Sequence, residues 1–597
     1  MTAPDSPAPR LANSKTWGSD PIAALLRAMG IEYIAFTPGA SFRGLHDSLV
    51  NYLGTKKPDM LLAVHEESAV AIAHGYAKVT GKPMAVALHA NVGLMHATMA
   101  IFNAWCDRMP ILLIGAEGPM DAVHRRPWVD WIHTMADLPA LIRGYTKWDD
   151  HPRSVHAALE SILRANLIAT TAPQGPTFVC LDAGLQEQMV DGAVELPPVE
   201  RFKTPEPPDP PADAVSRAAA VLQKAKNPVI MIGRVSLDEG DWDRRVALAE
   251  RLGARVVTDL KWGAAFPTKH RLHPFPPGLY ITPDAHAAIR AADAILSLDW
   301  IDLAGTLRQS NEGGLPAGTV IHCSVDQHIH RGSSMDYQGL PPVDISILCP
   351  PDRLVPKLLD ALGPRKSAPA LVAGGAAPKP AANAPAAVAP TIITVEMLSD
   401  ACGKALADCR PSFVRLPIGW PGDNCDFRHP LDFLGSDGGG GLGAGPGLVI
   451  GAALALKGTG RMAVALLGDG DFLMGVTALW TGVHYKTPAL IVVANNQSFF
   501  NDELHQERVA RRRDRPVENK WIGMRMSEPI FDLAMLARGQ GAVGIGAVKD
   551  PAKLDEALRQ AVAEVRGGKL VVLDVHVAPE YARATSAALM RNAPSYR

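Results

Sequence analysis

Two segments of the chain carry oxygen-bearing side chains that suit a divalent cation. Asp469 follows an apolar run in "LLGDGDF", and Asn496 stands 27 positions later in "NNQSF". Mg²⁺ takes oxygen ligands, usually one or two carboxylates together with substrate phosphates. Asp469, the amide oxygen of Asn496 and the main-chain carbonyl of Ser498 would form the protein's half of such a shell. The two segments therefore predict a magnesium site with room for a diphosphate.

The residues beside Asp469 favour the approach of an anion. Gly468 and Gly470 leave the backbone uncovered, and a helix expected to start near Asp471 would direct free N–H groups at a phosphate. A GDG tripeptide alone is more often a simple turn. The prediction therefore depends on the second segment and on its distance along the chain.

These side chains need a scaffold that brings two strand ends together. Short apolar runs alternate with helical patterns along the whole chain, as in residues 31–36, 60–64, 83–88 and 110–115, and again in "NPVIMIG", "ADAILSL", "RMAVALLG" and "PALIVVAN". Repeated strand–helix units with continuous apolar strands indicate parallel sheets covered on both faces. We predict an α/β protein of three domains, each a mostly parallel sheet flanked by helices. Ligands of such sheets bind at the carboxyl ends of the strands.

Two segments have the composition of linkers. Residues 197–211 contain seven prolines, and residues 364–390 are rich in Ala, Pro and Gly. Both compositions favour extended, solvated chain. The predicted domains are therefore residues 1–190, 212–363 and 391–597, each of ordinary domain size.

Composition limits the class of partner. The 597 residues are 47% hydrophobic and 20% charged, with a net charge of −2, so no overall field attracts nucleic acid or an anionic membrane. The uncharged run at 438–456 contains eight glycines and reads as a loop entering a buried helix, not as a membrane span. The N-terminus has no apolar signal segment. Seven scattered cysteines without a CxxC pair suggest buried thiols, no zinc site and a cytoplasmic location.

The GDG tripeptide is followed by an NN pair, with 27 positions between Asp469 and Asn496. This arrangement resembles the cofactor motif of thiamine diphosphate (ThDP) enzymes. The resemblance implies Mg²⁺ and the diphosphate at Asp469, Gly470, Asp471, Asn496 and Ser498. A glycine run at 435–447 is similar to the segment over which this family bends its cofactor. There Leu442 would support the bend, and the carbonyl of Gly440 would accept a hydrogen bond from the aminopyrimidine amine.

The family divides its site between a diphosphate domain and a pyrimidine domain, and the N-terminal segment "VHEESAVAIAHGYAKVTGKP" resembles the second. Glu66 takes the place of the glutamate that faces N1′ of the aminopyrimidine. A carboxyl group there favours the imino tautomer of the ring, which then accepts the proton of the reactive carbon. Without the metal motif, Glu66 and Glu67 would read as first-turn acids of a helix.

The segment "VALHANVGLMHATMAIFNAW" resembles that of the benzoylformate decarboxylases within the family. It implies that His89 projects into the site and moves a proton or holds a substrate carboxylate. Two features depart from that subgroup. Ala40 stands where those enzymes carry a serine, with Ser41 one residue later, and residues 298–307 offer no counterpart of their middle-domain histidine.

Asp502 lies six residues beyond Asn496, where enzymes of the pyruvate decarboxylase type have an acidic active-site residue. It would deliver a proton after CO₂ leaves; the alternative is an acid at a helix start. An arginine cluster at 508–515 forms either a salt-bridged surface or a site for an anionic substrate tail such as a CoA phosphate.

The resemblance favours Mg²⁺- and ThDP-dependent cleavage of a carbon–carbon bond beside a carbonyl, above all non-oxidative decarboxylation of a small 2-oxo acid to an aldehyde. Alternatives are an acetolactate synthase-like carboligase, a 2-hydroxyacyl-CoA lyase, and a ThDP-binding sensor without turnover. Because the family builds its site from two subunits, the resemblance also implies a homodimer or a homotetramer.

Overall fold

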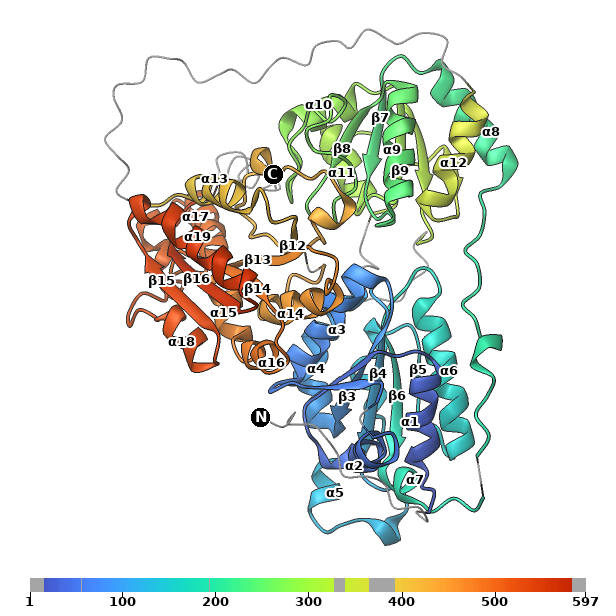
Figure 1. Cartoon of the computed structure of the whole chain (residues 1–597). Coiled ribbons are helices and arrows are strands. Elements are labelled where there is room, and N and C mark those ends of the chain that lie inside the picture. Colours follow the sequence, from blue (N-terminus) through green and yellow to red (C-terminus); the bar gives the residue numbers. More distant parts are fainter. Residues whose placement is uncertain are drawn as a thin grey trace.

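The computed structural model describes residues 15–54, 56–192, 194–326, 339–363, 392–436 and 438–581. Three separate β-sheets organise these residues, and helices flank each sheet (Figure 1). The predicted linker at 364–390 lies outside the described residues. The predicted α/β class is confirmed, because every paired strand in the three sheets runs parallel to its neighbour.

The N-terminal sheet has six strands in the order β2-β1-β3-β4-β6-β5. Its strands are β1 (Tyr33–Phe36), β2 (Asp59–Leu62), β3 (Met84–His89), β4 (Ile111–Glu117), β5 (Asp149–Asp150) and β6 (Thr177–Asp182). Its helices are α1 (Ser19–Ala28), α2 (Arg43–Asp47), α3 (Glu66–Thr80), α4 (Ala90–Cys106), α5 (Val129–Ile132), α6 (Val155–Thr170) and α7 (Ala183–Glu187). Apolar strands buried on both faces, such as β4, match the continuous apolar runs of the sequence.

The middle sheet has five strands in the order β11-β10-β9-β7-β8. Its strands are β7 (Pro228–Ile232), β8 (Arg255–Thr258), β9 (Ala294–Leu298), β10 (Thr319–Cys323) and β11 (Ile345–Ile347). Its helices are α8 (Ala212–Lys224), α9 (Glu239–Leu252), α10 (Pro283–Arg290), α11 (Leu303–Ser310) and α12 (Pro351–Leu362).

The C-terminal sheet has five strands in the order β12-β13-β14-β16-β15. Its strands are β12 (Pro411–Arg415), β13 (Met462–Gly468), β14 (Ala489–Asn495), β15 (Val543–Val548) and β16 (Leu570–His576). Its helices are α13 (Val395–Leu406), α14 (Gly445–Ala455), α15 (Asp469–Gly475), α16 (Ala478–His484), α17 (Phe500–Arg512), α18 (Leu533–Gly539) and α19 (Pro551–Arg566). The exact domain limits stay predictions.

Helices α3 and α14 join the N-terminal and C-terminal parts, and they lie side by side in Figure 1. Glycines allow their backbones to meet. A Cβ on Gly75 would lie 2.0 Å from the carbonyl oxygen of Leu448, and a Cβ on Gly451 would lie 1.9 Å from that of Ile72. Real Cβ atoms do not approach backbone oxygens so closely. The crossing therefore fixes the start of α3, which carries Glu66, relative to the C-terminal sheet.

Replacing Gly75 by alanine is expected to destabilise the protein by about 1–3 kcal/mol, because the new methyl group has to push two helix backbones apart. Gly403→Ala is the matched control: Gly403 lies in α13 with no atom within 4 Å of its would-be Cβ. Alanine in an open helical site is neutral or stabilising. Chemical denaturation of both variants measures the difference; equal stability of the two would contradict this packing.

No helix in the described ranges is both long and apolar enough to cross a membrane.

Candidate active site

The two predicted metal-binding segments meet at the carboxyl edge of the C-terminal sheet. Strands β13 and β14 are hydrogen-bonded neighbours, and Gly468 pairs with Ala494 in their register. Asp469 follows Gly468 by one residue and Asn496 follows Ala494 by two, so both residues lie at the ends of adjacent strands. The prediction that the segments lie side by side is confirmed.

Asp469 is a buried carboxylate with one oxygen left over. Its Oδ1 accepts a hydrogen bond from the N–H of Gly470 at 2.8 Å, whereas Oδ2 is buried without a hydrogen-bond partner. Burial raises the pKa of Asp469 to about 6, against the opposing effect of nearby backbone N–H groups. A buried carboxylate oxygen without a partner is costly. A cation at Oδ2 would satisfy it, so this residue fits the predicted magnesium site. Helix α15 starts at Asp469, two residues before the expected start.

The NN segment turns sharply beneath Asp469. Asn496 Oδ1 accepts from the N–H of Ser498 at 3.0 Å, and Gln497 has a φ of +57°, a left-handed conformation. The hydroxyl of Ser498 donates to the buried Glu503 at 2.5 Å. The Ser498 side chain is thus directed at Glu503, and its main-chain carbonyl stays the predicted metal ligand.

A second buried carboxylate, Asp574 on β16, was missed by sequence reasoning. Its Oδ1 accepts from the side-chain amide of Asn495 at 2.9 Å, which gives the first Asn of the pair a structural role. Burial raises the pKa of Asp574 to about 6, and the charges of Asp532 and Asp469 raise it further against the Asn495 hydrogen bond. One feature of the sequence could have indicated it: Asp574 stands inside the apolar run "VVLDV", and an acidic residue in a buried strand is rarely without a partner.

These raised pKa values predict an unusual pH dependence of the metal-free protein. A carboxyl group whose folded pKa lies above its ordinary value stabilises the fold at low pH, and this contribution is lost as the pH rises through the folded pKa. For Asp469 and Asp574 that window ends near pH 6. Without Mg²⁺, raising the pH from 5 to 7 should cost on the order of 1–2 kcal/mol per group.

Calorimetric unfolding of the metal-free protein at pH 5 and pH 7 measures this effect, and Asp574→Asn should show a smaller loss than the unchanged chain. Mg²⁺ with ThDP should restore stability at pH 7. An identical pH slope in Asp574→Asn would mean that this carboxyl group is not responsible.

The glycine-rich loop is tied to the same edge by Asp471. Its Oδ1 accepts from the N–H groups of Gly443 at 2.7 Å and of Gly445 at 3.4 Å, and Arg415 lies 3.2 Å from Oδ2. The Asp471 side chain thus holds the loop, while its backbone belongs to the first turn of α15. Leu442, in this loop, is 39% exposed.

Two glycines have backbone requirements that side chains would violate. Gly440 has a φ of +67°, which leaves its peptide group in an orientation that L residues rarely adopt. A Cβ on Gly470 would lie 2.9 Å from the ring of Phe499. Both glycines predicted to serve the cofactor therefore also have structural reasons to be glycine.

Glu66 lies in the N-terminal part, at the first position of α3, and is 8% exposed. Its Oε2 is 3.0 Å from Nδ1 of His96, whose ring stacks on His65 at 5.1 Å. Within the described residues it makes no hydrogen bond to the metal-binding segments. The neighbouring Glu67 lies against the glycine loop instead, and burial, then the charge of Asp471, raises the pKa of Glu67.

His89 ends β3, as predicted, and Ser41 is its hydrogen-bond partner. Ser41 Oγ lies 2.9 Å from Nδ1 of His89, and the N–H of Ser41 points at the same nitrogen at 3.4 Å. The N–H of Ala90 donates to Ser41 Oγ at 3.3 Å. Because a backbone N–H can only donate, these contacts favour Nδ1 as the acceptor and, in the neutral ring, a proton on Nε2.

The surroundings of His89 favour its neutral form. Burial lowers the pKa of His89, and the neighbouring His133, 4.7 Å away between ring centres, lowers it further against the opposing charge of Glu66. Three histidines, at positions 65, 89 and 96, thus lie near Glu66, and His133 extends this histidine cluster by packing on His89. Neither His96 nor His133 was predicted as a site residue. His96 stands in the same segment as His89, residues 86–105, whereas His133 lies beyond it, in a loop.

Asp502 is exposed on the first turn of α17, and its N–H donates to the carbonyl of Phe499 at 2.9 Å. Its charge adds to burial in raising the pKa of Tyr581. The arginine cluster lies at the end of the same helix, where Arg511 pairs with Glu507 at 2.7 Å.

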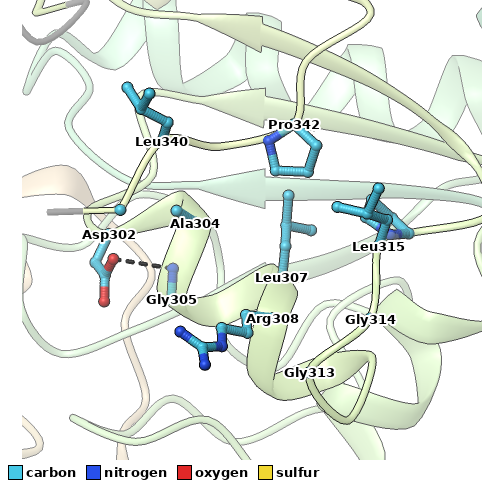
Figure 2. A pocket seen from close by; sticks show the side chains of 12 residues that line it. Asp302, Ala304, Gly305, Leu307, Arg308, Gly313, Gly314, Leu315, Leu340 and Pro342 are labelled. Carbon is cyan, nitrogen blue, oxygen red and sulfur yellow. Dashed lines mark hydrogen bonds between the residues drawn. The ribbon is translucent and has the colours of Figure 1, made fainter.

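A separate cavity of about 520 Å³ lies in the middle part, where Leu340 and Pro342 face Leu307 and Arg308 (Figure 2). Asp302 caps α11 there by accepting from the N–H of Gly305 at 3.0 Å. This cavity includes none of the predicted site residues.

Comparison with known families assigns the chain to one class. Residues 16–141, 215–338 and 419–575 match, in order, the N-terminal TPP binding domain, the central domain and the C-terminal TPP binding domain of thiamine pyrophosphate enzymes. Thiamine pyrophosphate (TPP) is another name for ThDP. The chain belongs to the ThDP-dependent enzyme family, and ThDP and a small-molecule substrate follow from that membership.

Individual relatives fall in two groups. The acetolactate synthase large subunit of Haemophilus influenzae is 22% identical over 94% of this chain and 95% of its own length. The benzoylformate decarboxylase of Pseudomonas aeruginosa is 24% identical over 74% of this chain and 79% of its own length. The crystal structure of benzoylformate decarboxylase from Polynucleobacter necessarius shares the fold with a TM-score of 0.75 at 21% identity, covering 95% of this chain and 99% of that chain.

Proposed function

We propose that this ThDP enzyme catalyses Mg²⁺-dependent, non-oxidative decarboxylation of a 2-oxo acid to an aldehyde. The observation that carries the proposal is the position of His89 at the end of β3, where Ser41 contacts its ring and Glu66 lies nearby. With the ring proton on Nε2, His89 can donate a hydrogen bond to a substrate carboxylate and later supply a proton. Bound ThDP supplies the electron sink that accepts the bonding pair when CO₂ leaves.

The C-terminal half of the site holds the metal and the diphosphate. Asp469 Oδ2, the Asn496 amide oxygen and the Ser498 carbonyl are the proposed Mg²⁺ ligands, and the unpartnered state of Asp469 Oδ2 supports this assignment. The backbone of Gly470 and Asp471 faces the diphosphate. Asp471 also fixes the glycine loop, so that Leu442 and the Gly440 carbonyl meet the cofactor.

The N-terminal half of the site moves protons. Glu66 would hold the aminopyrimidine by a hydrogen bond and favour its imino tautomer. The Glu66 carboxyl group lies 3.0 Å from Nδ1 of His96, a contact with which the cofactor would compete. Asp502 is the third proposed acid–base group, after Glu66 and His89. It is exposed on α17, and a role in catalysis requires a substrate or a second chain to cover it.

A carboligase of the acetolactate synthase type is the second candidate. The relative from Haemophilus influenzae, which matches 94% of this chain, favours it. The same active site can also join two carbonyl compounds. After CO₂ has left, a proton supplied by His89 gives the aldehyde, whereas addition to a second carbonyl compound before that proton arrives gives the acyloin.

A 2-hydroxyacyl-CoA lyase is less well supported. It needs cations free to bind phosphate, but the Arg511 guanidinium is already engaged by Glu507. The cluster therefore behaves, at least in part, as a salt-bridged surface.

We further propose that two chains share each site. Large apolar side chains are exposed beside both halves: Val64, Val92 and Met95 near Glu66, and Leu442 and Met474 at the glycine loop. Exposed apolar side chains that gather around a polar site are typical of a protein interface. A homodimer, or a homotetramer of two such dimers, would cover them.

Incubation of the protein with aliphatic, aromatic and CoA-linked 2-oxo and 2-hydroxy acids, ThDP and Mg²⁺ tests the reaction type. Aldehyde as the main product supports decarboxylation, and acyloin as the main product supports the carboligase. His89→Ala should lower aldehyde formation by about 10²–10⁴-fold. His156→Ala, an exposed histidine on α6, is the control and should leave it unchanged.

A further inference from the structure

Three metal-ligating side chains lie together in the N-terminal part, outside the site described above. Glu117 ends β4, Cys180 lies in β6, and His151 follows the short strand β5. One ligand atom from each residue lies within 4.8 Å of the other two. The register of β4 and β6 fixes two of them, since Gly115 pairs with Cys180 and Glu117 with Asp182.

Polar atoms in this cluster are buried without partners. The Glu117 side chain is 1% exposed, and its Oε1 has no hydrogen-bond partner, although Nδ1 of His151 is 3.5 Å away. Nε2 of His151 is also buried and without a hydrogen-bond partner. The other carboxylate oxygen, Oε2 of Glu117, accepts from the N–H of Met135 at 3.3 Å. An unsatisfied carboxylate oxygen and an unsatisfied imidazole nitrogen are thus buried in one small cluster, and burial of polar atoms without partners is costly.

The surrounding charges favour a cation there. Besides Glu117 itself, the carboxylates that act on the cluster are Asp137, Asp150 and Asp182, whereas Arg153 is the cation that acts on all three members. Negative charge therefore exceeds positive charge around the cluster. Burial keeps the thiol of Cys180 protonated by raising its pKa, and a bound metal would displace that proton.

We propose that Glu117, His151 and Cys180 form a zinc site. A thiolate, an imidazole and a carboxylate are the three ligand types of protein zinc centres, and the set is too soft for Mg²⁺ or Ca²⁺. Tetrahedral coordination requires ligand atoms roughly 3.4 Å apart. Rotation of the side chains, which shifts the ligand atoms by about 1 Å, would bring them to this separation around the ion. The fourth position is left for water. The sequence shows no zinc spacing because two ligands come from the separate strands β4 and β6 and the third follows β5.

The site would anchor the loop that carries His133. Residues 118–137 leave β4 at Glu117 and return to it through the hydrogen bond from Met135. His133, within this loop, packs against His89. A metal at Glu117 would therefore fix the loop at the base of the histidine cluster. This role is structural, and it does not depend on which reaction the enzyme catalyses.

Cobalt substitution of the intact protein, saturated with ThDP and Mg²⁺, tests the proposal. Co²⁺ should bind at one equivalent per chain and produce a thiolate-to-cobalt charge-transfer band, which an oxygen-ligated ion cannot give. Zn²⁺ should displace the Co²⁺ and abolish the band. Glu117→Gln and His151→Asn should each weaken cobalt binding by at least about 10-fold, and Zn²⁺ should raise the thermal midpoint of the unchanged chain more than that of either variant.

Cys180→Ser should lose the band, and Cys323→Ser is the matched control. Cys323 is buried with its sulfur 3.5 Å from that of Cys349, the other place in the described residues where soft ligands meet. Persistence of the band in Cys180→Ser, its loss in Cys323→Ser, or cobalt binding without any thiolate band in the unchanged chain would each overturn the proposal. Glu117→Gln and His151→Asn keep the test decisive if Cys180→Ser fails to fold.

Discussion

Asp469→Asn is expected to weaken Mg²⁺-dependent ThDP binding by at least about 100-fold. Loss of residues that merely support a metal ligand typically costs 10–100-fold, so loss of a charged ligand should cost more. The amide keeps the shape of the side chain but removes the charge from the buried oxygen that has no protein partner. Titration calorimetry of ThDP at fixed Mg²⁺ measures the change, and turnover should fall in parallel.

Asp555→Asn provides the control for Asp469→Asn, since Asp555 is exposed on α19, the helix that connects β15 to β16, and is not a predicted site residue. Its ThDP affinity should match that of the unchanged chain. Asp469→Asn should also be more stable than the unchanged chain in the absence of metal, because it removes a buried carboxylate with a raised pKa. Normal ThDP affinity in Asp469→Asn would rule out the proposed metal site.

Glu66→Gln is expected to slow hydrogen–deuterium exchange at the reactive carbon of bound ThDP by about 10²–10⁴-fold. Glutamine can still accept or donate a hydrogen bond, but it cannot take the charge that sets the ring tautomer. ThDP binding should fall much less, because the metal and diphosphate contacts are made by the C-terminal part. Quenched-flow exchange followed by NMR of the released cofactor measures the rate.

Glu67→Gln separates the roles of the two adjacent acids. Glu67 lies nearer the glycine loop within one chain, whereas Glu66 faces the histidine cluster. We expect exchange close to normal in Glu67→Gln; slow exchange in Glu67→Gln with fast exchange in Glu66→Gln would reverse the assignment. If two chains share each site, mixed dimers of Glu66→Gln and Asp469→Asn should regain activity, because one of their two sites is intact.

Much of the fold could be predicted because its signals are local. Continuous apolar runs mark buried parallel strands, and β13 and β14 lie where "RMAVALLG" and "PALIVVAN" indicated. Tertiary contacts changed details. The helix expected after Asp469 is divided into α15 and α16, and Gly475 at the end of α15 packs against the Gly443 carbonyl, where a Cβ would lie at 2.1 Å.

The site was predictable where a motif joins residues close in sequence. Asp469 and Asn496 follow neighbouring strands, so strand order alone brings them together. Asp574, His96 and His133 could not be found in this way, because each meets its partner through long-range packing. The cluster of Glu117, His151 and Cys180 is the clearest example. Its residues are far apart in the sequence, and only the pairing of β4 with β6 and the position of the segment after β5 bring them together.

Titration of ThDP into the metal-free protein, with and without Mg²⁺, tests the central claim most directly. We predict binding of one ThDP per chain with Mg²⁺ present, and a large loss of affinity when the divalent ion is removed, because Asp469 and the diphosphate would then repel each other. Equal affinity with and without the ion, or no binding under either condition, would contradict the account.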